Sequence, residues 1–325
     1  MAELRYNPIL RDWVMVASHR QKRPNMPKDF CPFCPGSGKV PDHYDVHCYD
    51  NDFPALSPNP PEPDAFSNPL FETAPLHGKC EVILYSPNHT ATLPDLPQWQ
   101  VRKLVDLWTE RFVALSQDPK TKYVLIFENR GELVGVTMPH PHGQIYAYPW
   151  LPKKLQEECT SASEYKSEKG SCLFCDLLAA EQQDGRRIIF ETEHFVCYLP
   201  FYSEYPYGVN LMAKRHVQNL SELSDAEKDC LADTLRKTAG MMDSLFDKTM
   251  PYMMCLHQAP VNCEEDPDYY HFHIEFYPPL RSATQIKWNA SSETGAWAHC
   301  NPTAPEEKAV ELREAFERFC AKEEK

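Results

Sequence analysis

The 325-residue sequence has no long apolar run. No stretch approaches the ~18 residues that a membrane span needs. The first residues, Met-Ala-Glu-Leu-Arg-Tyr-Asn-Pro, also lack the charged segment and following apolar stretch that are typical of a signal peptide. We therefore expect a cytoplasmic protein with no membrane partner.

Positive charge is also scarce. The chain has 33 Lys and Arg against 47 Asp and Glu, which gives a formal net charge of -14. This balance disfavours bulk nucleic-acid binding, so a local basic cluster must meet any anionic substrate. The densest basic run is His19-Arg20-Gln21-Lys22-Arg23-Pro24, where Arg20 and Arg23 offer guanidinium forks that suit phosphate oxygens. The alternative is a solvated surface loop.

Disulfides are not expected, because thirteen cysteines are an odd number in a chain without a secretion signal. We expect reduced thiols and metal ligands instead. The pair Cys31-Pro-Phe-Cys34 fits either a zinc site or a redox motif, and zinc would need two further ligands.

The chain exceeds the usual single-core length of ~100–200 residues, so two cores or a composite of two halves is expected. Cys80–Tyr85 and Lys122–Phe127 have strand character. Between them, an apolar face that includes Val101, Leu104 and Trp108 predicts a helix of about 18 residues, closed by Pro119. The polar segment 153–171 is predicted to join two halves.

The plan then repeats. Cys172-Leu-Phe-Cys175 mirrors the first cysteine pair, and Val209-Asn-Leu-Met-Ala-Lys-Arg-His216 mirrors Val82-Ile-Leu-Tyr-Ser-Pro-Asn-His89. A capping box, Ser224-Asp-Ala-Glu227, opens a second helix, and a strand at 252–257 leads to His271-Phe-His273. The interval from His89 to His140 is 51 residues and that from His216 to His271 is 55, so one unit occurs twice.

Each unit offers two cysteines, one histidine and the first histidine of a His-x-His motif. Such a Cys₂His₂ set has no open position, which predicts structural zinc. The two predicted sets are Cys31, Cys34, His89 and His140, and Cys172, Cys175, His216 and His271.

The segment His140-Pro-His142-Gly-Gln144 carries the predicted chemistry. Near pH 7 a neutral imidazole can attack phosphorus without first losing a proton, which suits group transfer through His142. Gln144 can donate to a phosphoryl oxygen without adding negative charge. The alternative is a pair of surface histidines in a Pro-rich turn. In the second unit Glu275 stands where Gln144 does, and its carboxylate would repel a phosphoryl group, so we expect one catalytic centre per chain.

The chain resembles the galactose-1-phosphate uridylyltransferase family of the histidine triad superfamily. The resemblance rests on His140-Pro-His-Gly-Gln144, Phe127-Glu-Asn-Arg-Gly131 and Phe276-Tyr-Pro-Pro-Leu-Arg-Ser-Ala-Thr284. It implies an α+β fold, a duplicated histidine-triad-like half-barrel with antiparallel sheets and packed helices. Residues 1–165 would form the half with the active site and 166–325 a degenerate repeat.

The resemblance also implies an activity. UMP would pass between glucose 1-phosphate and galactose 1-phosphate through a covalent uridylyl group on His142, with UDP-glucose and a hexose 1-phosphate as substrates. Gln144 would hold the phosphoryl oxygen, while Arg20 and Arg23 would bind phosphate. Family members are commonly homodimers, in which the stretch 287–293 reaches the neighbour's site. The remaining implied substrate-binding residues are Asn51, Asp52, Asn129, Thr137, Lys287 and Glu293.

Two departures keep alternatives open. Some family members hold a second metal through one glutamate and three histidines, and here Glu158, His257 and His273 match while Glu275 takes the last place. That set would admit iron or zinc and is the rival of the second cysteine site. The cysteine pair at 172 and 175 instead resembles that of a relative, the plant-type ADP-glucose phosphorylase, which has two cysteine-containing zinc sites.

The second departure concerns the sugar, because Ser292 replaces the usual tyrosine of a Tyr-Glu pair. The alternative functions are therefore a phosphorylase or hydrolase of nucleoside diphosphate sugars that uses the same histidine, and a noncatalytic zinc-stapled binding protein. The intact His142-Gly-Gln144 disfavours the last of these.

Overall fold

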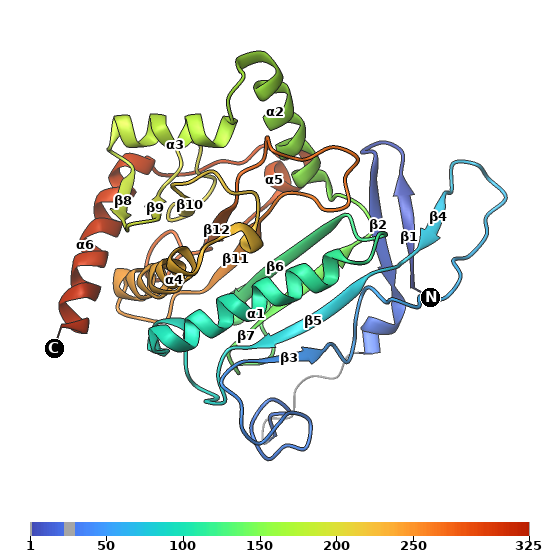
Figure 1. The fold of residues 1–325 in the computed structure, drawn as a ribbon, viewed down its shortest axis with the longest axis horizontal. Helices are drawn as coiled ribbons and strands as arrows, with labels where there is room; N and C mark the ends of the chain where they lie inside the picture. The colour runs from blue at the N-terminus through green and yellow to red at the C-terminus, as the bar shows by residue number, and fades with distance from the viewer. Residues whose placement is uncertain (1, 23–29, 325) are drawn as a thin grey trace.

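A nine-stranded antiparallel sheet forms the centre of the protein (Figure 1). The computed structural model describes residues 2–22 and 30–324. The strand order is β3-β5-β7-β6-β11-β12-β10-β9-β8. These strands are β3 (His47–Asp50), β5 (Lys79–Leu84), β6 (Tyr123–Arg130), β7 (His142–Tyr148), β8 (Ile188–Glu191), β9 (Phe195–Tyr198), β10 (Asn210–Ala213), β11 (Tyr252–His257) and β12 (His273–Tyr277).

A smaller sheet and a set of helices complete the fold. The small sheet has the order β2-β1-β4 and consists of β1 (Ala2–Asn7), β2 (Asp12–Ala17) and β4 (Thr73–Pro75). The α-helices are α1 (Gln98–Ser116), α2 (Lys153–Lys169), α3 (Leu173–Asp184), α4 (Asp225–Leu245), α5 (Ser291–Ala296) and α6 (Pro305–Glu323). The 3₁₀ helices are η1 (Ser18–Lys22), η2 (Leu93–Asp95), η3 (Glu132–Val134) and η4 (Leu220–Glu222).

The large sheet repeats itself about its middle. From the central β6–β11 pair, the order runs β6, β7, β5 in one direction and β11, β12, β10 in the other. Antiparallel pairing from Tyr252 opposite Arg130 to Leu256 opposite Ile126 joins the two halves into one sheet. The α+β class with antiparallel sheets is therefore confirmed, and each His-x-His motif lies at the start of an equivalent strand.

The main core lies between this sheet and the helices α1 and α4, which run along one face of it (Figure 1). Leu104 and Trp108 of α1 and Leu235 of α4 are fully buried there, together with Ile126 and Met254 from the central strands. Ile145 and Ala147 of β7 also belong to this core, so His142 and Gln144, at alternate positions of the same strand, lie on the opposite face.

Most of the predicted elements are confirmed, with small shifts at their ends. The first predicted strand is β5, and the predicted helix is α1, whose 19 residues end before Pro119. The capping box is present: the Ser224 hydroxyl accepts from the Glu227 amide at 3.3 Å, and the Glu227 carboxylate accepts from the Ser224 amide at 2.8 Å.

The polar segment 153–171 is not merely a join, because 153–169 forms helix α2. Its buried residues Leu155, Cys159 and Ala162 follow helical spacing, while the rest of the helix is polar and largely solvated. A stripe of three small or apolar residues was too narrow to stand out in the sequence. The boundary predicted at 165/166 falls inside this helix.

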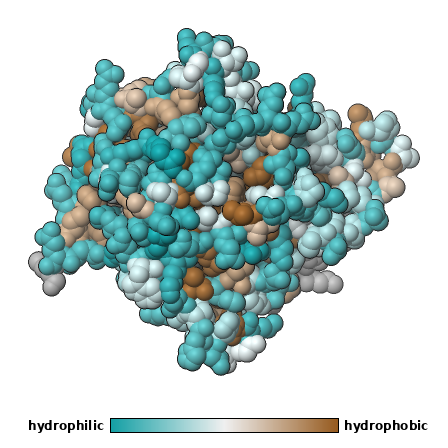
Figure 2. All heavy atoms as spheres, in the orientation of Figure 1, coloured by the Kyte–Doolittle hydropathy of each residue, from teal (hydrophilic) through white to brown (hydrophobic). Residues whose placement is uncertain are grey.

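The described helices include none that is both long and apolar enough to cross a membrane. Figure 2 shows hydrophilic side chains over most of the face that α1 and α4 cover.

Candidate active site

His142 is the first residue of β7, between β5 and β6 in the sheet. Pro141 precedes it and cannot donate to a ladder, but its carbonyl accepts from the Tyr85 amide at 3.0 Å. Next to His142, a Cβ on Gly143 would lie 2.3 Å from the Tyr85 hydroxyl oxygen and 3.0 Å from the Phe127 carbonyl oxygen. Only glycine fits there without displacement, so the strand beside His142 is tightly held.

The orientation of the His142 ring follows from one hydrogen bond. Its Nδ1 lies 2.7 Å from the carbonyl oxygen of His140, so Nδ1 carries the proton and donates it to that carbonyl. The lone pair is then on Nε2. The edge of Phe33 lies beside both rings, with its centroid 6.0 Å from each imidazole centroid. His142 is half-buried and is therefore reachable by a ligand.

Two cavities adjoin His142, and together they gather all four of the predicted nucleotide ligands. The smaller, of about 90 Å³, is lined by Asn51, Asp52 and Gln144 as well as His142. The larger, of about 260 Å³, is lined by Asn129 and Thr137 as well as His142. Residues from four separate segments of the sequence thus converge on one imidazole.

Three of the other predicted ligands line neither of these cavities. Arg20 is in η1, and its charge lowers the pKa of the Cys80 thiol in β5, although burial raises that pKa by more. Arg23 lies outside the described residues. Lys287 is buried, with Nζ 3.7 Å from the Glu293 carboxylate, in the second half of the chain. Neither Lys287 nor Glu293 lines the two cavities beside His142.

The first cysteine and histidine set comes together as a compact group. The Sγ atoms and ring nitrogens of Cys31, Cys34, His89 and His140 all lie within 4.8 Å of one another. His140 donates from Nε2 to the Ser86 carbonyl at 2.8 Å, which directs Nδ1 toward the thiols at 3.6 and 3.7 Å. Burial lowers the pKa of His140 to about 4, so its imidazole is neutral and can act as a ligand.

The second set repeats this arrangement. Cys172, Cys175, His216 and His271 also form a group within 4.8 Å. His271 donates from Nε2 to the Ala213 carbonyl at 2.9 Å, and its Nδ1 lies 3.3 Å from the Cys175 sulfur. Two thiols and two imidazoles without a carboxylate form a donor set that suits zinc in both halves.

Glu158, His257 and His273 form a third group within 4.8 Å. This group uses His273, whereas the second cysteine set uses His271, so the two groups share no residue. Burial raises the pKa of the Glu158 carboxyl, but His257 and Lys154 lower it by more, to about 2. The structure therefore assembles both of the groups that the sequence offered as alternatives for the second metal.

Two contributing residues were missed in the sequence. Lys154 contacts the third group, and its position one helical turn before Glu158 could have revealed it if 153–171 had been recognised as a helix. The Tyr44 hydroxyl lies 3.1 Å from His140 Nε2 and donates to the Phe33 carbonyl at 2.7 Å. Tyr44 comes from an irregular segment, so no periodicity could have indicated this contact.

A buried carboxyl lies next to Asn129 in β6. Glu128 is 6% exposed, and its Oε1 accepts from the Tyr252 hydroxyl at 3.4 Å, while Oε2 has no hydrogen-bond partner among the described residues. Burial raises the pKa of Glu128 to about 7, even though the Arg130 guanidinium opposes the shift. Its side chain also lines the larger cavity beside His142.

Comparison with known proteins identifies what this arrangement resembles. Residues 1–152 match the family model for the galactose-1-phosphate uridyl transferase N-terminal domain, and 158–294 match that for its C-terminal domain. A galactose-1-phosphate uridylyltransferase from Thermotoga maritima is 44% identical over 97% of this chain and 98% of its own length.

Solved structures agree with this match. A uridylyltransferase structure at 33% identity covers 97% of this chain and 99% of its own, with a TM-score of 0.90. An ADP-glucose phosphorylase from Arabidopsis thaliana with bound ADP-glucose shares the fold at 24% identity, with a TM-score of 0.74 over 97% of this chain and 98% of its own.

Proposed function

Because the chain belongs to the galactose-1-phosphate uridylyltransferase family, we propose that it exchanges UMP between glucose 1-phosphate and galactose 1-phosphate. Its substrates are UDP-glucose and a hexose 1-phosphate. The observation that carries this proposal is the hydrogen bond from His142 Nδ1 to the His140 carbonyl, because it leaves the Nε2 lone pair for attack on phosphorus.

In the first half-reaction, His142 Nε2 forms a bond to the α-phosphorus of UDP-glucose. The bond from that phosphorus to the bridging oxygen breaks, and glucose 1-phosphate leaves with the electron pair. The His140 carbonyl, which accepts from Nδ1, stabilises the positive charge that develops on the ring. Galactose 1-phosphate then attacks the uridylyl phosphorus, and the imidazole leaves unchanged.

Gln144 supports the transfer without acting as a base. Its amide lines the cavity that also contains His142, where it can donate to a nonbridging phosphoryl oxygen. A sugar phosphate is a leaving group that needs little protonation, so an acid is not required at this position.

The remaining predicted ligands have roles in substrate binding. Asn51 and Asp52 on one side of His142, and Asn129 and Thr137 on the other, bind the nucleotide. We assign phosphate binding to Arg20 and Arg23. Lys287 and Glu293 contact the hexose in the site of a neighbouring subunit, which requires a homodimer.

Zinc is the metal that we propose for both Cys₂His₂ groups. Such an ion has no open coordination position, so it supplies structural support and takes no part in the reaction. In the first half it would fix His140, whose carbonyl orients His142 two residues later. We also infer a cytoplasmic location and two repeat units, residues 1–165 and 166–325.

A substrate-exchange assay tests the function. Purified protein is incubated with UDP-glucose, UDP-galactose or ADP-glucose, together with galactose 1-phosphate, glucose 1-phosphate or inorganic phosphate. We expect exchange with the uridine nucleotides and hexose phosphates, with parallel lines in double-reciprocal plots because the two half-reactions are separate. Intersecting lines, or no exchange with galactose 1-phosphate, would contradict the proposal.

A second candidate is a nucleoside diphosphate sugar phosphorylase that uses the same histidine. Two observations favour it: the second cysteine group, which resembles that of the ADP-glucose phosphorylases, and Ser292 in place of the family tyrosine. In the same assay such an enzyme would release a nucleoside diphosphate from ADP-glucose when inorganic phosphate is the acceptor.

A further inference from the structure

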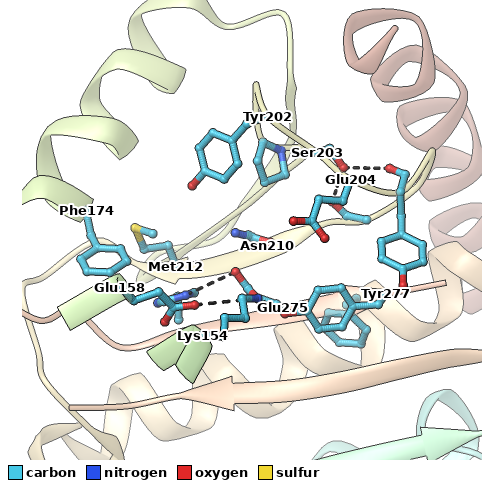
Figure 3. Close-up of a pocket in the computed structure, with 15 residues that line it drawn as sticks. Lys154, Glu158, Phe174, Tyr202, Ser203, Glu204, Asn210, Met212, Glu275 and Tyr277 are labelled. Carbon is cyan, nitrogen blue, oxygen red and sulfur yellow. Dashed lines mark hydrogen bonds and ion pairs between the residues drawn. The ribbon is translucent and has the colours of Figure 1, made fainter. Parts of the chain in front are cut away.

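Glu158 and His273 of the third group line a cavity of about 230 Å³, together with Glu275 (Figure 3). Glu158 comes from α2, His257 from β11, and His273 and Glu275 from β12. All four side chains are at most 17% exposed. Two carboxylates and two imidazoles at this spacing form a donor set that iron, manganese or zinc could use.

A lysine already contacts both carboxylates. Lys154 Nζ lies 2.6 Å from Glu275 Oε2 and 3.8 Å from Glu158 Oε1. It also donates to the Tyr277 hydroxyl at 2.7 Å. Figure 3 shows Lys154 and Glu158 beside Glu275 on one side of the cavity, with Tyr202 and Glu204 on the other.

Each carboxylate also contacts other side chains of the cluster. His257 lies between them, with Nδ1 3.0 Å from Glu158 Oε2 and Nε2 3.2 Å from Glu275 Oε2. Glu158 Oε2 also accepts from the Tyr270 hydroxyl at 2.7 Å, and Glu275 Oε1 lies 3.6 Å from His273 Nε2. The atoms that a metal would need at the centre of the cluster, Glu158 Oε2, Glu275 Oε2 and both nitrogens of His257, therefore already contact one another.

The charge of the cluster also disfavours a bound metal ion. A divalent ion bound between Glu158 and Glu275 would lie next to the Lys154 ammonium, which contacts the same oxygens, and the two cations would repel each other. Both would also compete for Glu275 Oε2, the atom closest to Lys154.

We infer that Lys154 is an internal cation that occupies the place of a metal ion, so that the cluster of Glu158, His257, His273 and Glu275 binds no metal in this protein. The Lys154 ammonium group links α2 to β12, as a metal ion bound to carboxylates of both elements would. Lys154 and Glu158 both belong to α2. The inference concerns this cluster alone and does not depend on the proposed reaction.

Removing the lysine should convert the cluster into a metal site. The Lys154 side chain lines the cavity and is 56% exposed, so its loss would leave an entry path for an ion. In Lys154→Met both carboxylates lose their cationic partner, while the side chain keeps a similar length. We expect this variant to bind one more metal ion per chain than the wild type after exposure to ferrous iron or zinc and removal of excess metal.

A neighbouring lysine provides the matched control. Lys153 also belongs to α2, but it pairs with Glu157 at 2.6 Å, outside the cluster. Lys153→Met should therefore bind the same amount of metal as the wild type, and so should Lys154→Arg, which keeps the cation. The extra ion of Lys154→Met should be lost when His257→Gln is added.

A second variant keeps the inference testable if Lys154→Met does not fold. Glu275→His removes the partner of Lys154 and supplies a third imidazole, so it should also gain one ion per chain. The measurement is elemental analysis of the intact protein, with each variant compared with the wild type. The inference is overturned if the wild type loses one ion on His257→Gln, or if a folded Lys154→Met or Glu275→His variant gains none.

Discussion

Gly143→Ala tests whether close packing behind β7 fixes the position of His142. The added Cβ would lie 2.3 Å from the Tyr85 hydroxyl oxygen, whereas ordinary contacts lie at 3.4–4 Å. One of the two groups must therefore move by roughly 1 Å. Overpacking of this kind costs about 1–3 kcal/mol in the free energy of unfolding.

The same displacement should reduce activity. A shift of about 1 Å in a reacting group can cost on the order of 10²-fold in rate. We therefore expect Gly143→Ala to lower kcat by about that factor in the exchange assay while the affinity for UDP-glucose changes less, because the cavity walls formed by Asn51 and Asn129 are untouched.

The double variant Gly143→Ala, Tyr85→Phe identifies the cause. The Tyr85 hydroxyl is buried and makes no hydrogen bond of ordinary length in the described part of the chain, although it interacts with the Glu128 carboxyl, so Tyr85→Phe alone measures the cost of losing that interaction. In the double variant the closest contact is removed, while the Phe127 carbonyl remains 3.0 Å away. Stability should recover in part, with a coupling of about 0.5–3 kcal/mol.

Urea unfolding and steady-state kinetics of the four proteins are the measurements. Gly295→Ala is the control for adding a methyl group, since a Cβ there meets nothing within 4 Å. Because Gly295 lies in α5, where alanine has the higher helix propensity, this control should not lower stability and should raise it by at most about 1 kcal/mol. A Gly143→Ala protein as stable and active as the wild type, or a double variant no better than the single one, would refute the reasoning.

Three further predictions follow from the site. The pKa of Glu128 is raised to about 7, so its contribution to stability is lost as pH rises from its unfolded value near 4.5 through 7. At pH 8 the free energy of unfolding of Glu128→Gln should therefore exceed that of the wild type by up to about 3 kcal/mol, and at pH 4 the two should differ little. An equal difference at both pH values would contradict this. The pair Cys172→Ser, Cys175→Ser should lose one of two zinc ions by elemental analysis yet keep measurable exchange activity, whereas an unchanged zinc content would exclude the second site. Gln144→Ala should lower kcat by about 10–10³-fold through the lost hydrogen bond, and an unchanged kcat would remove that role.

Much of the framework could be predicted from the sequence because it is repeated. A CxxC pair is ambiguous alone, but two copies followed by equivalent histidines predict two closed ligand groups, and the structure brings both together. The helices that include Val101 and follow Ser224 could also be predicted, because their apolar spacing and capping box are local features of the sequence.

The unpredicted features depend on contacts between distant segments. The role of Lys154 cannot be predicted from the sequence, because its ammonium group meets Glu275, 121 residues away, only when α2 packs against β12. The close contact of Gly143 with Tyr85 arises from the pairing of β5 with β7. Such constraints become visible only when the sheet is assembled.

The most direct test of the proposed mechanism is detection of the covalent intermediate on His142. The protein is incubated with UDP-glucose alone, digested under mildly alkaline conditions, and its peptides are analysed by mass spectrometry. The mechanism predicts one uridylyl group on the peptide that contains His142, its disappearance on addition of galactose 1-phosphate, and no label in His142→Ala. A label on another residue, or full turnover by His142→Ala, would contradict it.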